Sequence, residues 1–118
     1  MLRASLAAAL AYAVVHLAFP HALAAQPSFD CRKATSSVEI TICNNSDLSM
    51  RDGVMSDLYN DARNSPYIDR NDLLRSQRAW WRKRENQCGR SRQAVKCLED
   101  LYSERIDELN FMLYGRVY

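Results

Sequence analysis

Residues 73–113 read LLRSQRAWWRKRENQCGRSRQAVKCLEDLYSERIDELNFML, and this stretch decides the fold. Apolar side chains recur at intervals of three and four on both sides of the central Cys-Gly-Arg sequence, which is typical of two amphipathic helices. The spacing predicts helices over 73–87 and 98–113 that run antiparallel and are joined by a tight turn. Gly89 has the freedom to end the first helix in the left-handed conformation, and Ser91 can cap the second.

The apolar stripes of this hairpin indicate which residues form the core. Trp80 lies on the stripe of the first helix, so anchoring the core is its expected role. Arg84 and Arg105 also fall on apolar stripes, where an arginine can bury its stem and pair its head with a carboxylate. Asp52 and Glu39 are the expected carboxylate partners, so both arginines are predicted to be structural. The predicted structural core consists of Trp80, Leu98, Tyr102, Arg105, Leu109 and, from an earlier helix, Tyr59.

Two further helices are predicted before the hairpin. Ser36 followed by Glu39 has the form of a capping box and predicts a short helix through residues 38–43. A longer helix begins near Asp47 and ends before Pro66, because proline disfavours helix in the residue before it. Strand-like alternation and internal repeats do not occur in the sequence. The predicted fold class is therefore all-α: a small disulfide-stapled bundle of one short and three longer helices.

The first 25 residues have the pattern of a cleavable signal peptide. Arg3 supplies a positive start, residues 6–19 are an apolar run, and Ala22-Leu23-Ala24-Ala25 is a small-residue cleavage site. The run is short for a membrane span, although an uncleaved anchor is the alternative. We favour cleavage of residues 1–25, after Ala24 or Ala25. This leaves one domain over 26–118 that is secreted or periplasmic and has no membrane attachment.

Removal of this segment limits the chemistry of the chain. His16 and His21 are the only histidines, and both lie in it, so the remaining chain has no imidazole for a catalytic triad or a zinc site. The segment holds one of the 16 basic residues and none of the 14 acidic ones, so the formal charge falls from +2 to +1. Such a balance argues against a nucleic-acid binder. We expect no enzymatic activity, metal or cofactor.

All four cysteines remain after cleavage. In an oxidising compartment an even number of cysteines indicates disulfides rather than a zinc site or a catalytic thiol. Of the three possible pairings we favour Cys31–Cys43 and Cys88–Cys97, because each closes a short loop at low entropic cost. A domain of this size is marginal on its core alone, and each disulfide is worth on the order of 3 kcal/mol on the chain-entropy model. The cysteines are therefore predicted to be structural.

Several short motifs along the chain match one family. They are Phe29-Asp30-Cys31-Arg32-Lys33-Ala34, Val38-Glu39, Ile42-Cys43, Asp47-Leu48, Gln77-Arg78-Ala79-Trp80 and Glu104-Arg105-Ile106. Through them, and through its four cysteines, the chain resembles the lysozyme inhibitor LprI-like N-terminal domain family. The resemblance implies a helical four-cysteine fold, a protein partner and inhibition of lysozyme. The chain departs from the family pattern at Arg51, where leucine is suggested, and at Glu85, where aspartate is usual; it also lacks a lipoprotein cysteine.

Basic side chains surround the predicted hairpin turn, and Trp81 stands among them in the sequence. A guanidinium there could enter a cleft lined by carboxylates, and the cleft of lysozyme has two catalytic ones. Trp81 lies about 100° round the helix from Trp80 and could anchor a partner; packing against a neighbouring helix is the alternative. For each charged residue, a solvated helix face is the plain alternative. The expected binding surface consists of Arg78, Trp81, Arg82, Lys83, Arg90, Arg92 and Lys96.

These expectations combine into one function. The chain is predicted to be an exported protein-binding domain that inhibits lysozyme by occluding its cleft. The second expectation is an envelope binding or scaffold module unrelated to lysozyme. A small hydrolase is the third, because the acidic residues of the last helix lie on its polar face, outside the concave setting that catalysis requires.

Overall fold

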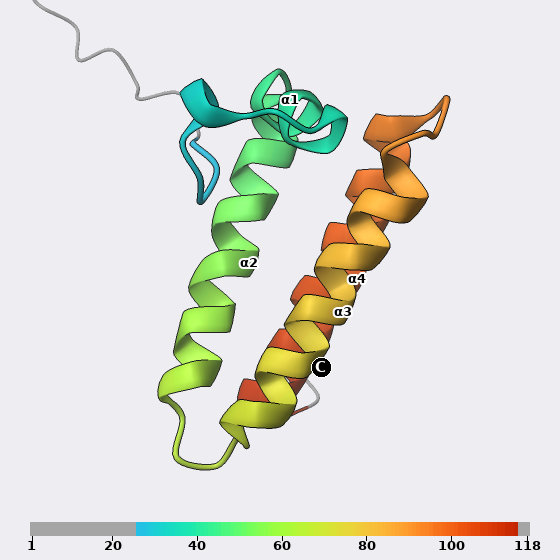
Figure 1. The fold of residues 1–118 in the computed structure, drawn as a ribbon. Helices are drawn as coiled ribbons and strands as arrows, with labels where there is room; N and C mark the ends of the chain where they lie inside the picture. The colour runs from blue at the N-terminus through green and yellow to red at the C-terminus, as the bar shows by residue number, and fades with distance from the viewer. Residues whose placement is uncertain (1–25, 116–118) are drawn as a thin grey trace, which may run out of the picture.

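The structure is a computed structural model that describes residues 26–115; the predicted signal peptide over 1–25 lies outside the described residues. The described part contains four α-helices and one 3-10 turn, and it contains no strand (Figure 1). The elements are η1 (Cys31–Lys33), α1 (Ser37–Cys43), α2 (Ser46–Asn64), α3 (Arg70–Cys88) and α4 (Ala94–Tyr114). The prediction of an all-α fold with one short and three longer helices is confirmed. No helix in this part of the chain is long and apolar enough to cross a membrane.

The three long helices form the body of the molecule. Helices α3 and α4 run antiparallel as the C-terminal hairpin, and α2 lies alongside them (Figure 1). Helix α2 packs most extensively against α4 and much less against α3. Helix α1 and the N-terminal lead-in cover the end of the bundle that carries the hairpin turn, whereas residues 65–69 connect α2 to α3 at the opposite end (Figure 1).

Side-chain caps fix where the helices begin. Ser36, Asn45 and Asp69 each accept a hydrogen bond from the backbone amide three residues later, at distances between 2.8 and 3.1 Å. The capping-box prediction at Ser36 holds for this bond, but the Glu39 carboxylate makes no return hydrogen bond within residues 26–115. Helix α2 ends at Asn64, two residues before Pro66, as predicted.

A single hydrophobic core lies between the helices. Trp80 and Tyr102 meet edge to face at its centre, with ring centroids 5.0 Å apart. The N–H group of the buried indole has a hydrogen-bond partner, because Trp80 Nε1 donates to the Leu101 carbonyl oxygen at 3.3 Å. Of the predicted core residues, Trp80, Leu98, Tyr102, Arg105 and Leu109 are buried, and Tyr59 is partly buried and packed against the core.

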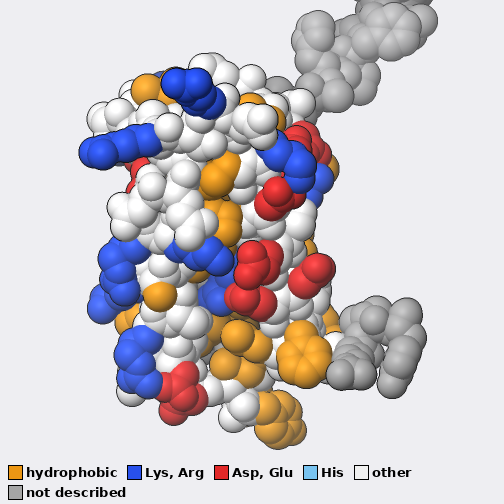
Figure 2. Space-filling view, turned by 90° about the vertical axis from the view of Figure 1, so that its right-hand side faces the viewer, with side chains coloured by type: hydrophobic (Ala, Val, Ile, Leu, Met, Phe, Trp, Pro, Cys, Tyr) orange, Lys and Arg blue, Asp and Glu red, His pale blue; other side chains and the backbone are white. Residues whose placement is uncertain are grey.

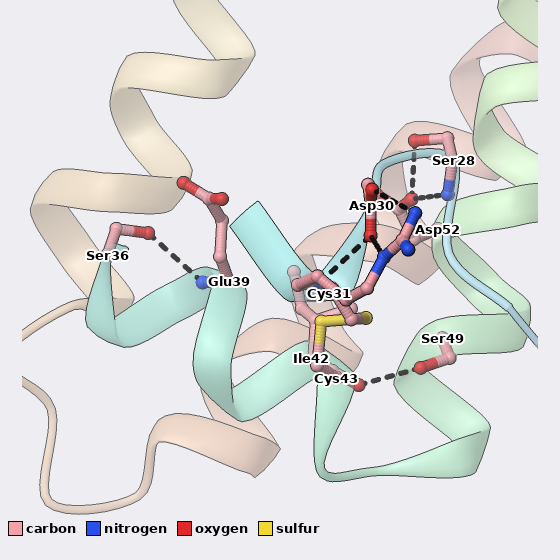
Figure 3. Close-up of a disulfide and its surroundings, with 10 residues drawn as sticks. Ser28, Asp30, Cys31, Ser36, Glu39, Ile42, Cys43, Ser49 and Asp52 are labelled. Atoms are coloured by element: carbon pink, nitrogen blue, oxygen red, sulfur yellow. Dashed lines mark hydrogen bonds and ion pairs between the residues drawn. A yellow bond between two sulfur atoms is a disulfide. The ribbon is translucent and has the colours of Figure 1, made fainter. Parts of the chain in front are cut away.

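Two disulfides each join elements that are neighbours in the sequence. Cys31 is bonded to Cys43 and Cys88 to Cys97, with Cα–Cα distances of 5.8 and 5.5 Å, and these are the two local pairings favoured from the sequence. The first disulfide ties η1 to the last turn of α1 (Figure 3). The corner between α1 and α2 is also fixed by a polar contact, in which buried Ser49 donates from Oγ to a carbonyl oxygen of α1 at 2.7 Å.

The hairpin turn differs from the prediction. Gly89 follows α3 in the right-handed helical conformation, with φ −62° and ψ −26°, so the prediction of a left-handed glycine was wrong. A Cβ atom at this position would lie 2.5 Å from the Glu85 carbonyl oxygen, which is a steric reason for glycine. Ser91 does not cap α4, because that helix starts later, with Gln93 at its N-cap. The glycine with a positive φ, 71°, is Gly115 at the end of α4.

Candidate functional site

The end of the molecule formed by residues 89–93 is a braced turn. The Cys88–Cys97 disulfide closes it at its base. The Ser91 amide donates to the Cys88 carbonyl oxygen at 3.2 Å, and Ser37 Oγ of α1 donates to the Gly89 carbonyl oxygen at 2.9 Å. The backbone of the turn is therefore held by both helices of the hairpin and by the neighbouring helix α1.

Four of the predicted basic residues carry exposed guanidinium groups that make no ion pair within the described part of the chain. Arg90 and Arg92 lie on the braced turn. Arg78 and Arg82 are four residues apart and so share one exposed face of α3. Figure 2 shows Lys and Arg side chains along one edge and at the top of this side of the molecule, and others beside Asp and Glu side chains.

The two predicted lysines behave differently from these arginines. Lys83 faces α4, and its Nζ lies 3.7 Å from a carboxylate oxygen of Glu104. Lys96 pairs with Asp100 one turn further along α4. Both pairs are exposed to solvent, where an ion pair contributes about 0–1 kcal/mol. Of the basic residues predicted to bind a partner, the four arginines are therefore unpaired within residues 26–115, whereas the two lysines form ion pairs.

Trp81 lies on another flank of α3. It is 43% exposed, whereas the neighbouring Trp80 is buried. Its side chain lines two hollows on the seam between α2 and α3. The structure thus separates Trp81 from the braced turn and the lysines with which the sequence grouped it.

The two hollows form one feature, the α2–α3 groove, because Tyr59 and Trp81 line both of them. The first, of about 430 Å³, lies beneath the N-terminal lead-in and has Glu39, Asn60 and Arg84 among its polar lining residues. The second, of about 510 Å³, lies further along the seam. Its lining consists of Tyr59, Arg63, Arg70, Asn71, Leu74 and Trp81.

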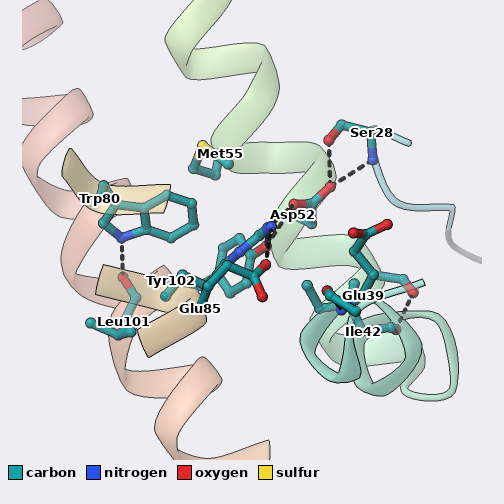
Figure 4. A network of polar contacts seen from close by, with 12 residues as sticks. Ser28, Glu39, Ile42, Asp52, Met55, Trp80, Glu85, Leu101 and Tyr102 are labelled. Atoms are coloured by element: carbon teal, nitrogen blue, oxygen red, sulfur yellow. Dashed lines mark hydrogen bonds and ion pairs between the residues drawn. The ribbon is translucent and has the colours of Figure 1, made fainter. Parts of the chain in front are cut away.

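A buried polar network forms the floor of the first hollow (Figure 4). Asp52 is 1% exposed and accepts three hydrogen bonds of 2.6 Å: from the amide and the Oγ of Ser28 and from the hydroxyl of Tyr102. Arg84 Nη1 donates to the same hydroxyl at 2.9 Å and lies 3.8 Å from Asp52. Arg84 Nη2 donates to Glu85 at 3.0 Å. The network joins the lead-in to α2, α3 and α4, and the predicted pairing of Arg84 with Asp52 is present in it.

The network fixes the protonation states of Tyr102 and Arg84. Burial raises the pKa of the Tyr102 hydroxyl, and the neighbouring Asp52 adds to the rise while Arg84 opposes it. Burial alone would lower the pKa of Arg84, but its attraction to the Tyr102 oxygen and to Glu85 outweighs burial and raises that pKa. Tyr102 therefore stays neutral and Arg84 stays charged at physiological pH. The hydroxyl donates to Asp52 and accepts from Arg84 at the same time.

The two buried arginines are held in different ways. Arg105 pairs with Glu108 at 3.0 Å rather than with Asp52 or Glu39, and its Nε donates to Gln77 at 3.0 Å. Arg84 Nε has no hydrogen-bond partner in the described structure. The Arg84 guanidinium lies 5.7 Å from the centre of the Trp80 ring, and this cation–π contact offsets part of the missing bond.

Sequence reasoning missed most of the groove. Ser28 lies in an aperiodic lead-in, and nothing in the sequence relates it to Asp52. Arg63 and Arg70 flank the short α2–α3 connection, and both line the second hollow. Asp52 did carry a signal, since it falls on the apolar stripe of α2 between Leu48 and Met55.

The site therefore defines a class of protein. It is a small disulfide-stapled helical domain with a braced cationic turn at one end and an open groove along one seam. Among residues 26–115 no group of three or more His, Cys, Asp or Glu side chains is placed to hold a metal ion.

The comparison with protein families identifies the chain more closely. The model of the family described as lysozyme inhibitor LprI matches residues 31–109, which is more than half of the chain, so the chain belongs to this family. No curated protein sequence and no solved structure gives a significant match. The resemblance inferred from the sequence motifs is confirmed.

Proposed function

We propose that this protein inhibits lysozyme by binding the enzyme and occluding its substrate cleft. Membership of the lysozyme inhibitor LprI family supports lysozyme as the partner. The observation that carries the mode of binding is the braced turn with the exposed, unpaired guanidinium groups of Arg90 and Arg92. An inhibitor of this kind needs no catalytic group of its own.

The chemistry of the two surfaces is complementary. The cleft of lysozyme has two catalytic carboxylates, and a guanidinium group binds a carboxylate through two parallel hydrogen bonds. A turn that is already fixed by a disulfide and by the Ser37 contact loses little conformational entropy on binding, which favours affinity. Arg78 and Arg82, on the adjoining face of α3, extend the cationic surface.

The charge of the chain supports local rather than long-range attraction. The formal net charge falls from +2 to +1 when residues 1–25 are removed, so a basic lysozyme gains no electrostatic steering from it. The binding energy must then come from the few contacts at the cleft, and loss of one or two arginines should have a large effect.

Export is part of the same proposal. We propose that residues 1–25 are removed as a signal peptide and that residues 26–118 act in the periplasm or outside the cell. The two disulfides support this location, because such bonds persist in oxidising compartments.

A lytic assay with c-type and g-type lysozymes tests the proposal. Micromolar excess of the oxidised protein should inhibit at least one of the two enzymes. The double variant Arg90→Asp, Arg92→Asp should weaken inhibition at least about tenfold, since each charged hydrogen bond is worth about 1.5–3 kcal/mol. Thermal unfolding should be nearly unchanged, because both side chains are exposed.

The matched control is the double variant Arg63→Asp, Arg70→Asp, which changes the same charge in the α2–α3 groove and should inhibit like the wild type. Unchanged inhibition by the Arg90 and Arg92 variant would remove the assignment to the braced turn. Absence of inhibition by the wild type with both enzymes would favour an envelope binding or scaffold module instead.

A further inference from the structure

The α2–α3 groove has an unusual lining for a small helical domain. Trp81 and Tyr59 stand at the point where its two hollows meet. Trp81 is 43% exposed there, although burying an indole is strongly favourable. Each hollow falls in the range of about 300–1,000 Å³ that is typical of small-ligand sites. The groove is independent of the braced turn and of the inhibition proposed for it.

The polar residues of the groove argue against a lipid or another purely apolar ligand. In the second hollow, Leu74 is the aliphatic residue, and Asn71, Arg63 and Arg70 supply amide and guanidinium donors. In the first, Asn60 and Glu39 supply an amide and a carboxylate. A suitable ligand must therefore present flat apolar faces to the aromatic rings and many hydrogen-bonding groups around its edge. Sugar rings have this combination, with C–H groups on their faces and hydroxyl groups on their rims.

The second hollow also favours a negatively charged ligand. No acidic side chain is among its described lining residues. Neither Arg63 nor Arg70 forms an ion pair within the described part of the chain. The Arg63 guanidinium lies 5.9 Å from the centre of the Tyr59 ring, which holds the cation beside the aromatic surface. Two free guanidinium groups at one end of an aromatic groove fit a carboxylate carried by the ligand.

The geometry points to the α2–α3 groove as a binding site for an acidic glycan, in which a sugar ring stacks on the exposed face of Trp81 and a carboxylate pairs with Arg63 and Arg70. The site lies on a different flank of α3 from Trp80 and the core. A ligand bound there leaves the braced turn free, so glycan and protein partner can be held together.

Two oligosaccharides of equal length test the site by calorimetric titration of the oxidised protein. The acidic probe is a tetrasaccharide of alternating glucuronate and N-acetylglucosamine, and the neutral probe is a tetrasaccharide of N-acetylglucosamine alone. We expect saturable binding of the acidic probe with a Kd of about 1 mM or tighter and binding of the neutral probe at least about tenfold weaker. Equal affinity for the two probes, or no saturable binding of the acidic one, would overturn the proposal.

Variants assign the binding to named side chains. Trp81→Ala should weaken binding of both probes at least about tenfold, because it removes the aromatic face on which the sugar ring stacks. Arg63→Gln, Arg70→Gln should weaken only the acidic probe. Tyr67→Ala is the aromatic control, since Tyr67 is 95% exposed and outside the groove, and it should bind both probes normally.

The Arg90→Asp, Arg92→Asp variant should also bind the acidic probe normally, which separates the groove from the braced turn. Wild-type affinity in the Trp81 variant would place any binding elsewhere and overturn the proposal. The Arg63 and Arg70 substitutions are at exposed positions, so they keep the test valid even where Trp81→Ala impairs folding.

Discussion

Asp52 is the residue on which four segments of the chain converge. Its carboxylate is buried, and it is bonded by Ser28 of the lead-in and Tyr102 of α4, with Arg84 of α3 close by. An isolated buried carboxylate would be very costly, whereas one with several donors is tolerated. Removal of a single donor should therefore lower the free energy of unfolding, because it leaves part of the buried Asp52 carboxylate without a hydrogen bond.

The first prediction at this scale concerns the Tyr102 hydroxyl. Tyr102→Phe removes one donor to Asp52 and one acceptor for Arg84, so we expect the free energy of unfolding to fall by about 1–3 kcal/mol. Tyr114→Phe is the matched control: Tyr114 is exposed, and its change should stay within about 0.5 kcal/mol. Urea denaturation of both variants measures the difference. A loss below about 0.5 kcal/mol for Tyr102→Phe would mean that the hydroxyl is not what satisfies the pair.

Part of this network could be predicted from the sequence. Asp52 and Arg84 are charged residues on apolar stripes, and two opposite charges forced into one core are expected to meet. Ser28 could not be predicted, because its segment has no periodicity and its contact with Asp52 spans 24 residues of sequence. Arg105 pairs instead with Glu108, three residues along the same helix, because neighbours at this spacing lie on one face of a helix.

At the scale of the elements, periodicity predicted the helices because each long helix buries one continuous stripe. The turn was predicted less well. Glycine after a helix usually signals a left-handed residue, but Gly89 stays right-handed, and crowding by the Glu85 carbonyl oxygen is what disfavours a side chain there. A sequence contains the glycine but not the neighbour that excludes a Cβ atom.

Replacement of Gly89, which follows α3, and of Gly53, inside α2, by alanine should change the free energy of unfolding in opposite directions. Gly89→Ala should destabilise the hairpin by about 1–3 kcal/mol, because its Cβ would meet a backbone atom that cannot move freely. Gly53→Ala, inside α2, should stabilise by up to about 1 kcal/mol, since its Cβ would lie 3.4 Å from the Gln26 carbonyl oxygen, at contact distance. Thermal unfolding of the two variants checks this, and changes of the same sign would contradict it.

The arrangement of the elements also explains why the candidate sites were only partly foreseen. Arg90 and Arg92 could be placed on the turn because the turn is local. Trp81 could not be separated from them, because its surroundings include Tyr59 and Arg63 of α2, which no local pattern places beside it. Helix α2 packs mainly on α4, and this preference, which no local pattern encodes, leaves one flank of α3 open.

At the scale of the whole molecule, two disulfides add to the stability of a small core, and one of them also fixes the proposed binding end. The described domain has about the size at which only some 60–65% of the unfolded surface is buried, which makes it marginal on its core alone. One disulfide ties η1 to the end of α1, and the other closes the braced turn between α3 and α4. Rigidity at the proposed binding end and stability of the fold are therefore coupled.

Reduction of both disulfides should accordingly bring the domain close to unfolding. Their sequence separations are 12 and 9 residues, for which the chain-entropy model gives a combined stabilisation of about 5 kcal/mol, while small domains have about 5–15 kcal/mol in all. Cys31→Ser with Cys43→Ser should lose about half of it. Cys88→Ser with Cys97→Ser should lose more, because Cys88 is buried and its packing is lost as well. Far-ultraviolet circular dichroism during heating measures each loss, and a reduced protein that melts cooperatively at nearly the oxidised temperature would show that the helical core suffices without its disulfides.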